Sequence, residues 1–175
     1  MNTATRKIAA TLGTIFGISG ISHGFFETLQ GNTPTNGMFI SAIGEAQRMW
    51  PHGSEPAFTL IPNFLITGIA TMLVGLAIIV WSIGYIHRKN GAIVLLLLFI
   101  VLLLVGGGVA QILFFPWICL VASRINKPLV WWRKVLPVTY QSRLGKAWLW
   151  SLVTGSALMV FVLVIGITGF VPGLS

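Results

Sequence analysis

The chain of 175 residues lacks aspartate altogether, and it has only three glutamates and one cysteine. A single cysteine cannot form a disulfide within the chain. The lack of aspartate removes a common oxygen ligand of hard metal ions. Charged residues make up 8% of the sequence, whereas soluble proteins carry about a quarter. These absences exclude an ordinary soluble domain and a disulfide-stabilised one.

The signature motifs of several enzyme classes are also missing. The sequence contains no HExxH, GxSxG or CxxC motif, and no Walker or dinucleotide-binding glycine loop. No cofactor can therefore be named, no metal site is assigned, and the sequence leans away from an enzyme.

Apolar residues dominate what is present. Hydrophobic residues make up 55% of the chain, and the mean hydropathy is +0.90. Long apolar segments of this kind predict an all-α fold, a polytopic helical membrane bundle with residues 1–175 in one integral-membrane domain. The net charge of +8 comes from basic residues that flank these segments, so they indicate membrane orientation and not nucleic-acid binding. The expected partners are the lipid bilayer and, beyond it, other membrane subunits or a second copy.

The longest apolar run extends from Gly91 to Ser123 without a charge. As one helix it would be roughly 50 Å long, against about 30 Å for the hydrocarbon core of a bilayer. Either one long third helix is strongly tilted, which gives four spans, or the run turns back in a tight hairpin at Gly106, Gly107 and Gly108. We favour the hairpin, because it keeps the basic segment 124–146 in the cytoplasm. The five expected spans are 8–29, 59–85, 91–105, 109–123 and 147–170.

The distribution of charge predicts the orientation in the membrane. Arg6 and Lys7 precede the first span, so the N-terminus is expected on the cytoplasmic side. The membrane is expected to be the plasma membrane. Loop 30–58 is then outside, with a short interfacial helix between Asn36 and Trp50. The cytoplasmic segment is expected to bind lipid headgroups through its basic residues. These are Arg124, Lys127, Arg133, Lys134, Arg143 and Lys146.

Four glycines of the first span fall on one narrow stripe of the helix, which predicts close packing of another helix, and self-association is a further use of such a stripe. They are Gly13, Gly17, Gly20 and Gly24.

Polar side chains are expected to gather near the outer surface. His23 and Glu27 are one helical turn apart, and ionisable groups at membrane depth indicate function by default. A second interpretation is structural packing of the same groups, and a third is a metal site completed by Glu45, His52 and Glu55. The candidate ligand or proton residues are His23, Glu27, Gln30, Asn63, Thr67 and Gln111.

The sequence thus leaves the activity open between two main classes. The first is a non-enzymatic accessory, scaffold or small permeation protein, which the missing catalytic motifs favour. The alternative is a membrane enzyme or carrier that uses an outward-facing polar pocket around His23 and Glu27. A quinone- or lipid-handling subunit is a weaker third idea, suggested by the aromatic and methionine content.

Overall fold

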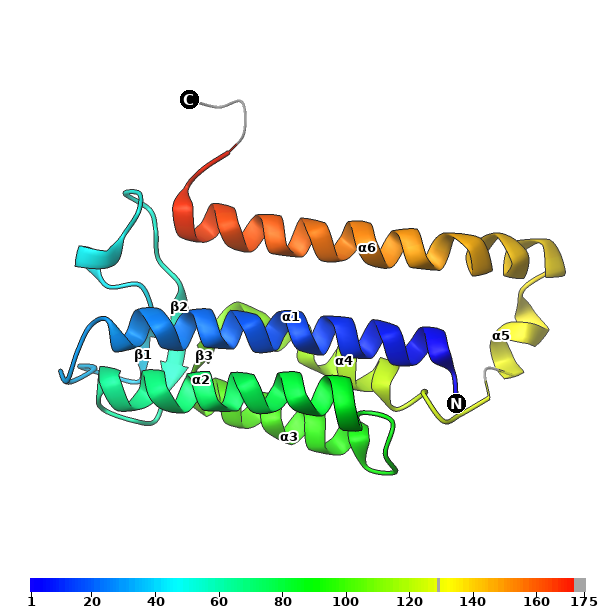
Figure 1. Cartoon of the computed structure of the whole chain (residues 1–175), viewed down its shortest axis with the longest axis horizontal. Helices are drawn as coiled ribbons and strands as arrows, with labels where there is room; N and C mark the ends of the chain where they lie inside the picture. Colours follow the sequence, from blue (N-terminus) through cyan, green and yellow to red (C-terminus); the bar gives the residue numbers. More distant parts are fainter. Residues whose placement is uncertain (129, 172–175) are drawn as a thin grey trace.

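The computed structural model describes residues 1–128 and 130–171, apart from the side chains of residues 131–133. The fold is mostly helical (Figure 1). Three helices of the described part are long and apolar enough to cross a membrane. They are α1 (Thr3–Thr28), α2 (Phe64–Val80) with its continuation η2 (Trp81–Tyr85), and α6 (Val138–Thr168). The membrane class expected from composition therefore holds at this level.

Helices α1 and α2 form a close antiparallel pair whose contact is built on glycine. A Cβ added at Gly17 would lie 2.8 Å from the carbonyl oxygen of Gly75, and one added at Gly24 would meet the carbonyl oxygen of Gly68. Gly13 and Gly20 likewise face neighbouring side chains, those of Ser82 and Leu102. The glycine stripe is thus occupied by other parts of the same chain.

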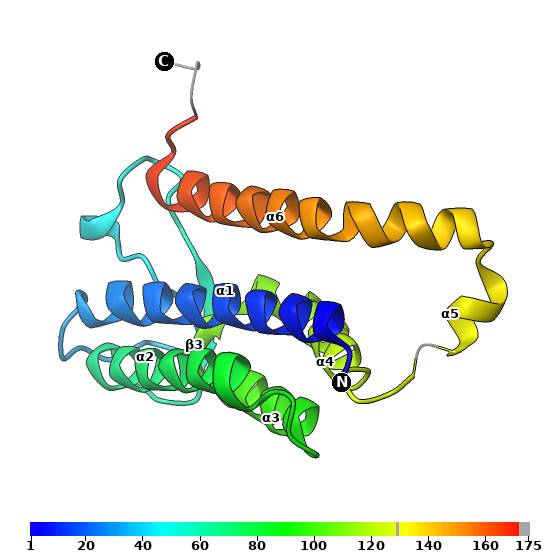
Figure 2. The same ribbon diagram turned by 45° about the vertical axis from the view of Figure 1, so that its right-hand side comes forward.

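The long apolar run reverses direction, but its glycines do not form a tight turn. Helix α3 (Gly91–Leu104) is followed by the strand β3 (Val105–Gly108), the 3₁₀ helix η3 (Val109–Leu113) and the helix α4 (Phe115–Ala122). After α4 the side-chain amide of Asn126 donates to the carbonyl of His87 at 2.8 Å. The run therefore ends beside the residues from which α3 started (Figures 1 and 2).

The second half of the run is not the continuous helix expected over 109–123, since η3 precedes a short α4. Pro116 lies in the first turn of α4, where a proline needs no helical hydrogen bond and so causes no kink. Aromatic rings fill the space between the two halves. The ring of Phe99 stacks on that of Phe115 at 4.2 Å, and the ring of Phe16 from α1 meets both.

A three-stranded antiparallel sheet corrects the expectation of an all-α fold. Its order is β1 (Phe39–Ser41), β2 (Pro56–Thr59) and β3. Strand β3 comprises Val105 and the three glycines and pairs with β2 at one edge of the sheet. Neighbouring residues leave no space for a side chain at any of the three glycines. The glycine run is therefore a buried strand and not a helical hairpin turn.

The expected interfacial helix between Asn36 and Trp50 is also wrong. Asn36 and Gly37 have positive φ angles of 54° and 145°, which no helix accommodates. The segment forms β1 and a single 3₁₀ turn, η1 (Glu45–Gln47).

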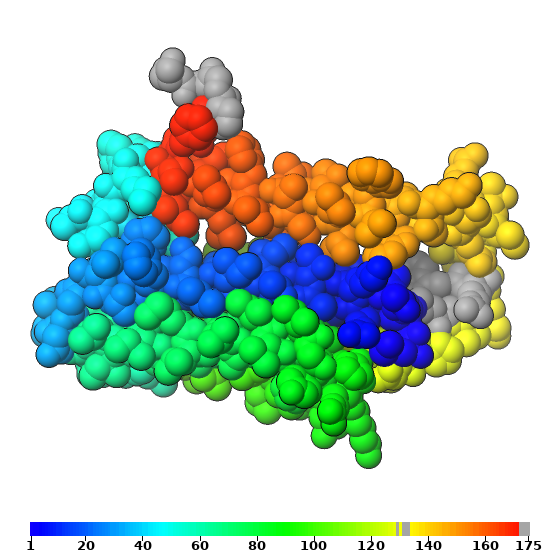
Figure 3. Space-filling view, viewed as in Figure 1, coloured from blue at the N-terminus to red at the C-terminus, as the bar shows by residue number. Residues whose placement is uncertain are grey.

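Helix α6 lies alongside α1 with little contact, and α5 (Val130–Val135) precedes it at the N-terminal end of the bundle (Figures 1 and 2). None of the residues of α6 is buried. The indole Nε1 of Trp50 donates to the carbonyl of Gly166 at 3.0 Å and ties the end of α6 to the outer connection. Figure 3 shows openings between α6 and α1 along their length.

The basic segment lies at the end of the bundle where the chain begins, since the backbone N–H of Asn2 donates to the carbonyl of Ile125 at 2.6 Å. Helix α6 starts at Val138, earlier than the expected span 147–170, so Arg143 and Lys146 belong to its first turns. The side chain of Arg133 lies outside the described residues. The remaining expected headgroup residues, Arg124, Lys127, Lys134, Arg143 and Lys146, are all exposed.

Candidate functional site

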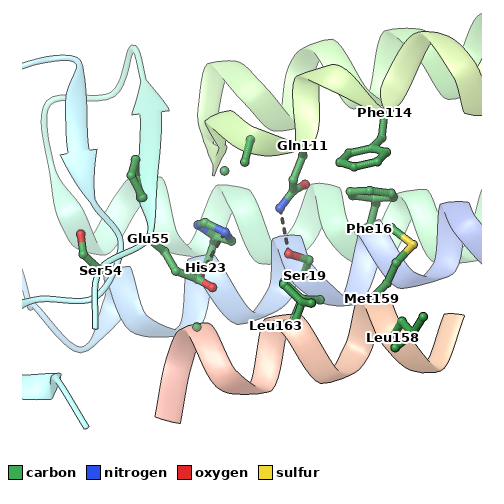
Figure 4. A pocket seen from close by; sticks show the side chains of 15 residues that line it. Phe16, Ser19, His23, Ser54, Glu55, Gln111, Phe114, Leu158, Met159 and Leu163 are labelled. Atoms are coloured by element: carbon green, nitrogen blue, oxygen red, sulfur yellow. Dashed lines mark hydrogen bonds and ion pairs between the residues drawn. The ribbon is translucent and has the colours of Figure 1, made fainter. Parts of the chain in front are cut away.

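A cavity of about 500 Å³ lies between α1, the start of β2, η3 and α6 (Figure 4). Most of its wall is apolar, and polar groups gather at one part of it. Helix α6 contributes only apolar residues and a glycine to the lining: Leu158, Met159, Val162, Leu163 and Gly166. The polar lining residues are Ser19, His23, Ser54, Glu55 and Gln111.

His23 and Glu55 meet at the polar part of the cavity. His23 Nε2 lies 3.0 Å from Glu55 Oε2, and both side chains are largely buried. Helix α1 supplies His23, whereas Glu55 is held by the sheet, since its carbonyl accepts from the N–H of Ala42 at 2.9 Å. Burial raises the pKa of Glu55 to about 7. The carboxyl group therefore changes its charge near neutral pH.

Gln111 and Ser19 form the neighbouring polar contact, drawn as a dashed line in Figure 4. The Gln111 amide Nε2 donates to Ser19 Oγ at 2.8 Å. Beyond them the rings of Phe16 and Phe114, whose centroids lie 5.5 Å apart, form an apolar wall. The cavity thus has a polar region next to an aromatic one.

Glu27 does not line this cavity but belongs to a second polar cluster, between α1, α2 and β3. It is fully buried, and its Oε2 lies 3.3 Å from the hydroxyl of Thr71. The hydroxyls of Thr71 and Thr67 both donate to the carbonyl of Val105, and Thr67 also pairs with Thr59 at 2.6 Å. This cluster fixes the start of β3 against α1 and α2.

The glycines of β3 separate the two polar clusters. A Cβ added at Gly108 would lie 2.7 Å from the imidazole of His23, and one added at Gly106 would lie 2.5 Å from Glu27 Oε2. The side chains of His23 and Glu27 therefore occupy the space that side chains of β3 would need. This contact explains why the strand lacks side chains at these two positions.

The remaining candidates position the outer connection. The Gln30 amide donates to the carbonyls of Ser41 and Ala42 at 3.0 and 2.8 Å. Asn63 Oδ1 accepts from the N–H of Ile66 as the N-cap of α2, and its amide donates to Asn32. Neither Gln30 nor Asn63 lines the cavity. Of the six predicted residues, only His23 and Gln111 do.

The sequence interpretation missed parts of the site for identifiable reasons. Ser19 is one turn before His23 on the same face of α1, and this spacing could have identified it. Glu55 was named only as a metal ligand, because nothing local in its segment shows that a sheet carries it to His23.

The structure does not bring together the full set of residues named for a metal site. Among the described residues, no group of three or more histidine, cysteine or acidic side chains is placed to hold a metal ion. Glu55 reaches His23, but the ring of His52 contacts that of Trp50 at 5.3 Å, and Glu45 is exposed.

Comparison of the chain with protein-family models, with curated proteins and with solved structures finds no match. The geometry of the cavity is therefore the feature of this chain that points to a function.

Proposed function

We propose that this chain is an integral membrane protein that binds an amphipathic small molecule in the cavity between α1 and α6. The polar head of the ligand lies at His23 and Glu55, and its apolar part lies along Phe16, Phe114 and α6. The observation that carries the proposal is a largely apolar cavity with a buried histidine–glutamate pair in its wall.

The size and lining of the cavity support this proposal. Small-molecule sites occupy roughly 300–1,000 Å³ and combine apolar walls with a few convergent polar groups. The volume of about 500 Å³ and the lining described above fit that pattern. Because α6 buries none of its residues, an apolar molecule can reach the cavity from the bilayer by passing between α6 and α1.

The cavity is the reason to prefer the ligand-binding alternative to the accessory or scaffold role that the sequence favoured. The glycine stripe of α1 gives little support for self-association, because α2 and its neighbours already cover it. Binding and carriage of a ligand require no covalent step, so the proposal does not depend on an enzymatic activity.

For the topology we propose five crossings of the plasma membrane, with the N-terminus in the cytoplasm. Support comes from the return of the chain after α4 to the end where α1 begins, since Asn126 contacts His87 and the N–H of Asn2 donates to Ile125. The basic segment is then on the cytoplasmic side, as the positive-inside tendency favours.

Labelling of an introduced cysteine tests this topology. Lys134→Cys should react with a membrane-impermeant maleimide only after expressing cells are permeabilised, because Lys134 is expected in the cytoplasm. Arg48→Cys, at an exposed position of the outer connection, should react in intact cells. Unmodified protein controls for reaction at the buried Cys119. Labelling of Lys134→Cys in intact cells would show that the proposed orientation is wrong.

Photolabelling tests the binding proposal. In phosphatidylcholine nanodiscs, a diazirine-bearing decanol should label peptides from α1 and α6, and excess decanol should compete with it. Gly166→Phe should reduce labelling by about tenfold, because Gly166 lines the cavity and a phenyl group there occupies its space.

Gly155→Phe is the matched control for this experiment. It places the same side chain on α6 at a position outside the cavity lining, where an added Cβ likewise meets no atom of the described residues within 4 Å. Labelling that decanol does not compete, or that Gly166→Phe and Gly155→Phe reduce equally, would contradict the proposed function.

A further inference from the structure

We propose that the cavity selects amphipathic amines, molecules with an apolar body and a protonated amine head, over the corresponding alcohols and carboxylates. This inference rests on the proposed function and specifies the chemical class of its ligand. The Glu55 carboxylate is the group that receives the amine, and Gln111 lines the same cavity.

The unpaired polar atoms of the cavity wall favour a ligand whose head group donates hydrogen bonds. Three buried atoms of the lining have no hydrogen-bond partner among the described residues: His23 Nδ1, Glu55 Oε2 and Gln111 Oε1. Buried polar groups without partners are costly, so a ligand that pairs with them gains affinity. Two of the three atoms are oxygens, and a carboxylate or amide oxygen only accepts hydrogen bonds. An ammonium head with three N–H donors complements them.

Glu55 Oε2 has an ion-pair contact but accepts no hydrogen bond. His23 Nε2 lies 3.0 Å away, but the contact lacks hydrogen-bond geometry, so the oxygen keeps its capacity to accept from a ligand. Hydrogen bonds between a charged donor and a carboxylate are roughly twice as strong as neutral ones. An amine should therefore bind better than an alcohol of the same length.

The charges around the cavity disfavour an acidic head. Neither lysine nor arginine is found in its described lining, although the chain carries a net charge of +8. The basic residues lie elsewhere, and the segment 124–146 is at the opposite end of α1 from His23. A carboxylate head would face the Glu55 carboxylate. The exposed surface, by contrast, attracts anions, so a preference for amines would be specific to the cavity.

Competition for the photolabel tests the inference. Decylamine, decanol and decanoate compete with the diazirine-bearing decanol in phosphatidylcholine nanodiscs at pH 8, for the unmodified protein and for Glu55→Gln. Each compound partitions equally into the bilayers of both samples, so the ratio of its half-inhibitory concentrations reports the site alone. Glu55→Gln should raise the half-inhibitory concentration of decylamine by about tenfold and change that of decanol by less than about threefold. It should lower that of decanoate.

Glu45→Gln is the matched control, because it removes the same charge from an exposed position of the same connection. It should leave all three half-inhibitory concentrations unchanged. A difference between the two variants separates the cavity from the general charge of the outer surface.

A second measurement follows the competition by decylamine and decanol as a function of pH. It uses the unmodified protein, so it does not depend on whether a variant folds. Because burial raises the pKa of Glu55 to about 7, the ionised fraction of this carboxyl rises about tenfold between pH 6 and pH 8. Decylamine stays protonated over this range, so its affinity should rise by up to about tenfold. His23 of α1 is the titratable group that faces Glu55, and η3 and α6 contribute none to the lining. Decanol should bind with nearly constant affinity.

The outcomes separate the two proposals. If decanol competes but decanoate competes as well as decylamine, or if decylamine is insensitive to both Glu55→Gln and pH, the amine selectivity is wrong and the binding function stands. If none of the three compounds competes with the label, the binding function itself is wrong.

Discussion

Gly24→Leu should abolish recovery of folded protein, and Gly24→Ala should lower the free energy of unfolding by about 1–3 kcal/mol, as overpacking of a close contact does. A Cβ at Gly24 would meet the carbonyl oxygen of Gly68 and lie 2.9 Å from the backbone nitrogen of Met72. These are backbone atoms, so they cannot move away without separating α1 from α2. Unfolding in increasing dodecyl sulfate, followed by circular dichroism, measures the difference.

Gly155→Ala provides the matched control. It is the same substitution in the interior of α6, where the added methyl group meets no described atom within 4 Å. Alanine favours a helix interior over glycine by roughly 0.5–1 kcal/mol, so this variant should be unchanged or slightly more stable. Equal stability of Gly24→Ala and Gly155→Ala would mean that α1 and α2 do not approach each other as closely as the structure indicates.

The predictable part of this fold follows from local patterns. Long apolar segments predict α1, α2 and α6, because a helix satisfies all its backbone hydrogen bonds within one segment and needs no partner far away in the sequence. The spacing of Gly13, Gly17, Gly20 and Gly24 marks a helix face where another backbone approaches. Both inferences need no knowledge of distant residues.

The sheet could not be predicted in this way, because its strands pair residues far apart in the sequence. Ala57 pairs with Gly108, and each segment alone lacks the alternating pattern of a strand. Three glycines in an apolar run are more typical of a turn than of a buried strand. Glu55 becomes part of the site only through the position of β2 in the sheet, where its carbonyl accepts from Ala42, so its role could not be predicted from its own segment.

A double-mutant cycle tests whether the His23 side chain of α1 occupies the space beside Gly108 of β3. Gly108→Ala should lower the free energy of unfolding by about 1–3 kcal/mol, because its Cβ would lie 2.7 Å from the imidazole of His23. In the background of His23→Ala the same substitution should cost much less, since the clashing ring is gone. The φ angle at residue 108 is −60°, which alanine adopts without strain. The cycle should therefore show a strong coupling between the two positions.

Gly106 is the matched comparison, because its Cβ would lie as close to Glu27 but its φ is +129°. Removing the Glu27 side chain cannot relieve backbone strain, which costs on the order of 1–3 kcal/mol. Gly106→Ala should therefore remain destabilising in the Glu27→Ala background, while Gly108→Ala is rescued in that of His23→Ala. If the costs of Gly108→Ala and His23→Ala simply add, the ring does not occupy the space beside β3. The close contact between the imidazole and β3, at the point where His23 meets Glu55, would then be wrong.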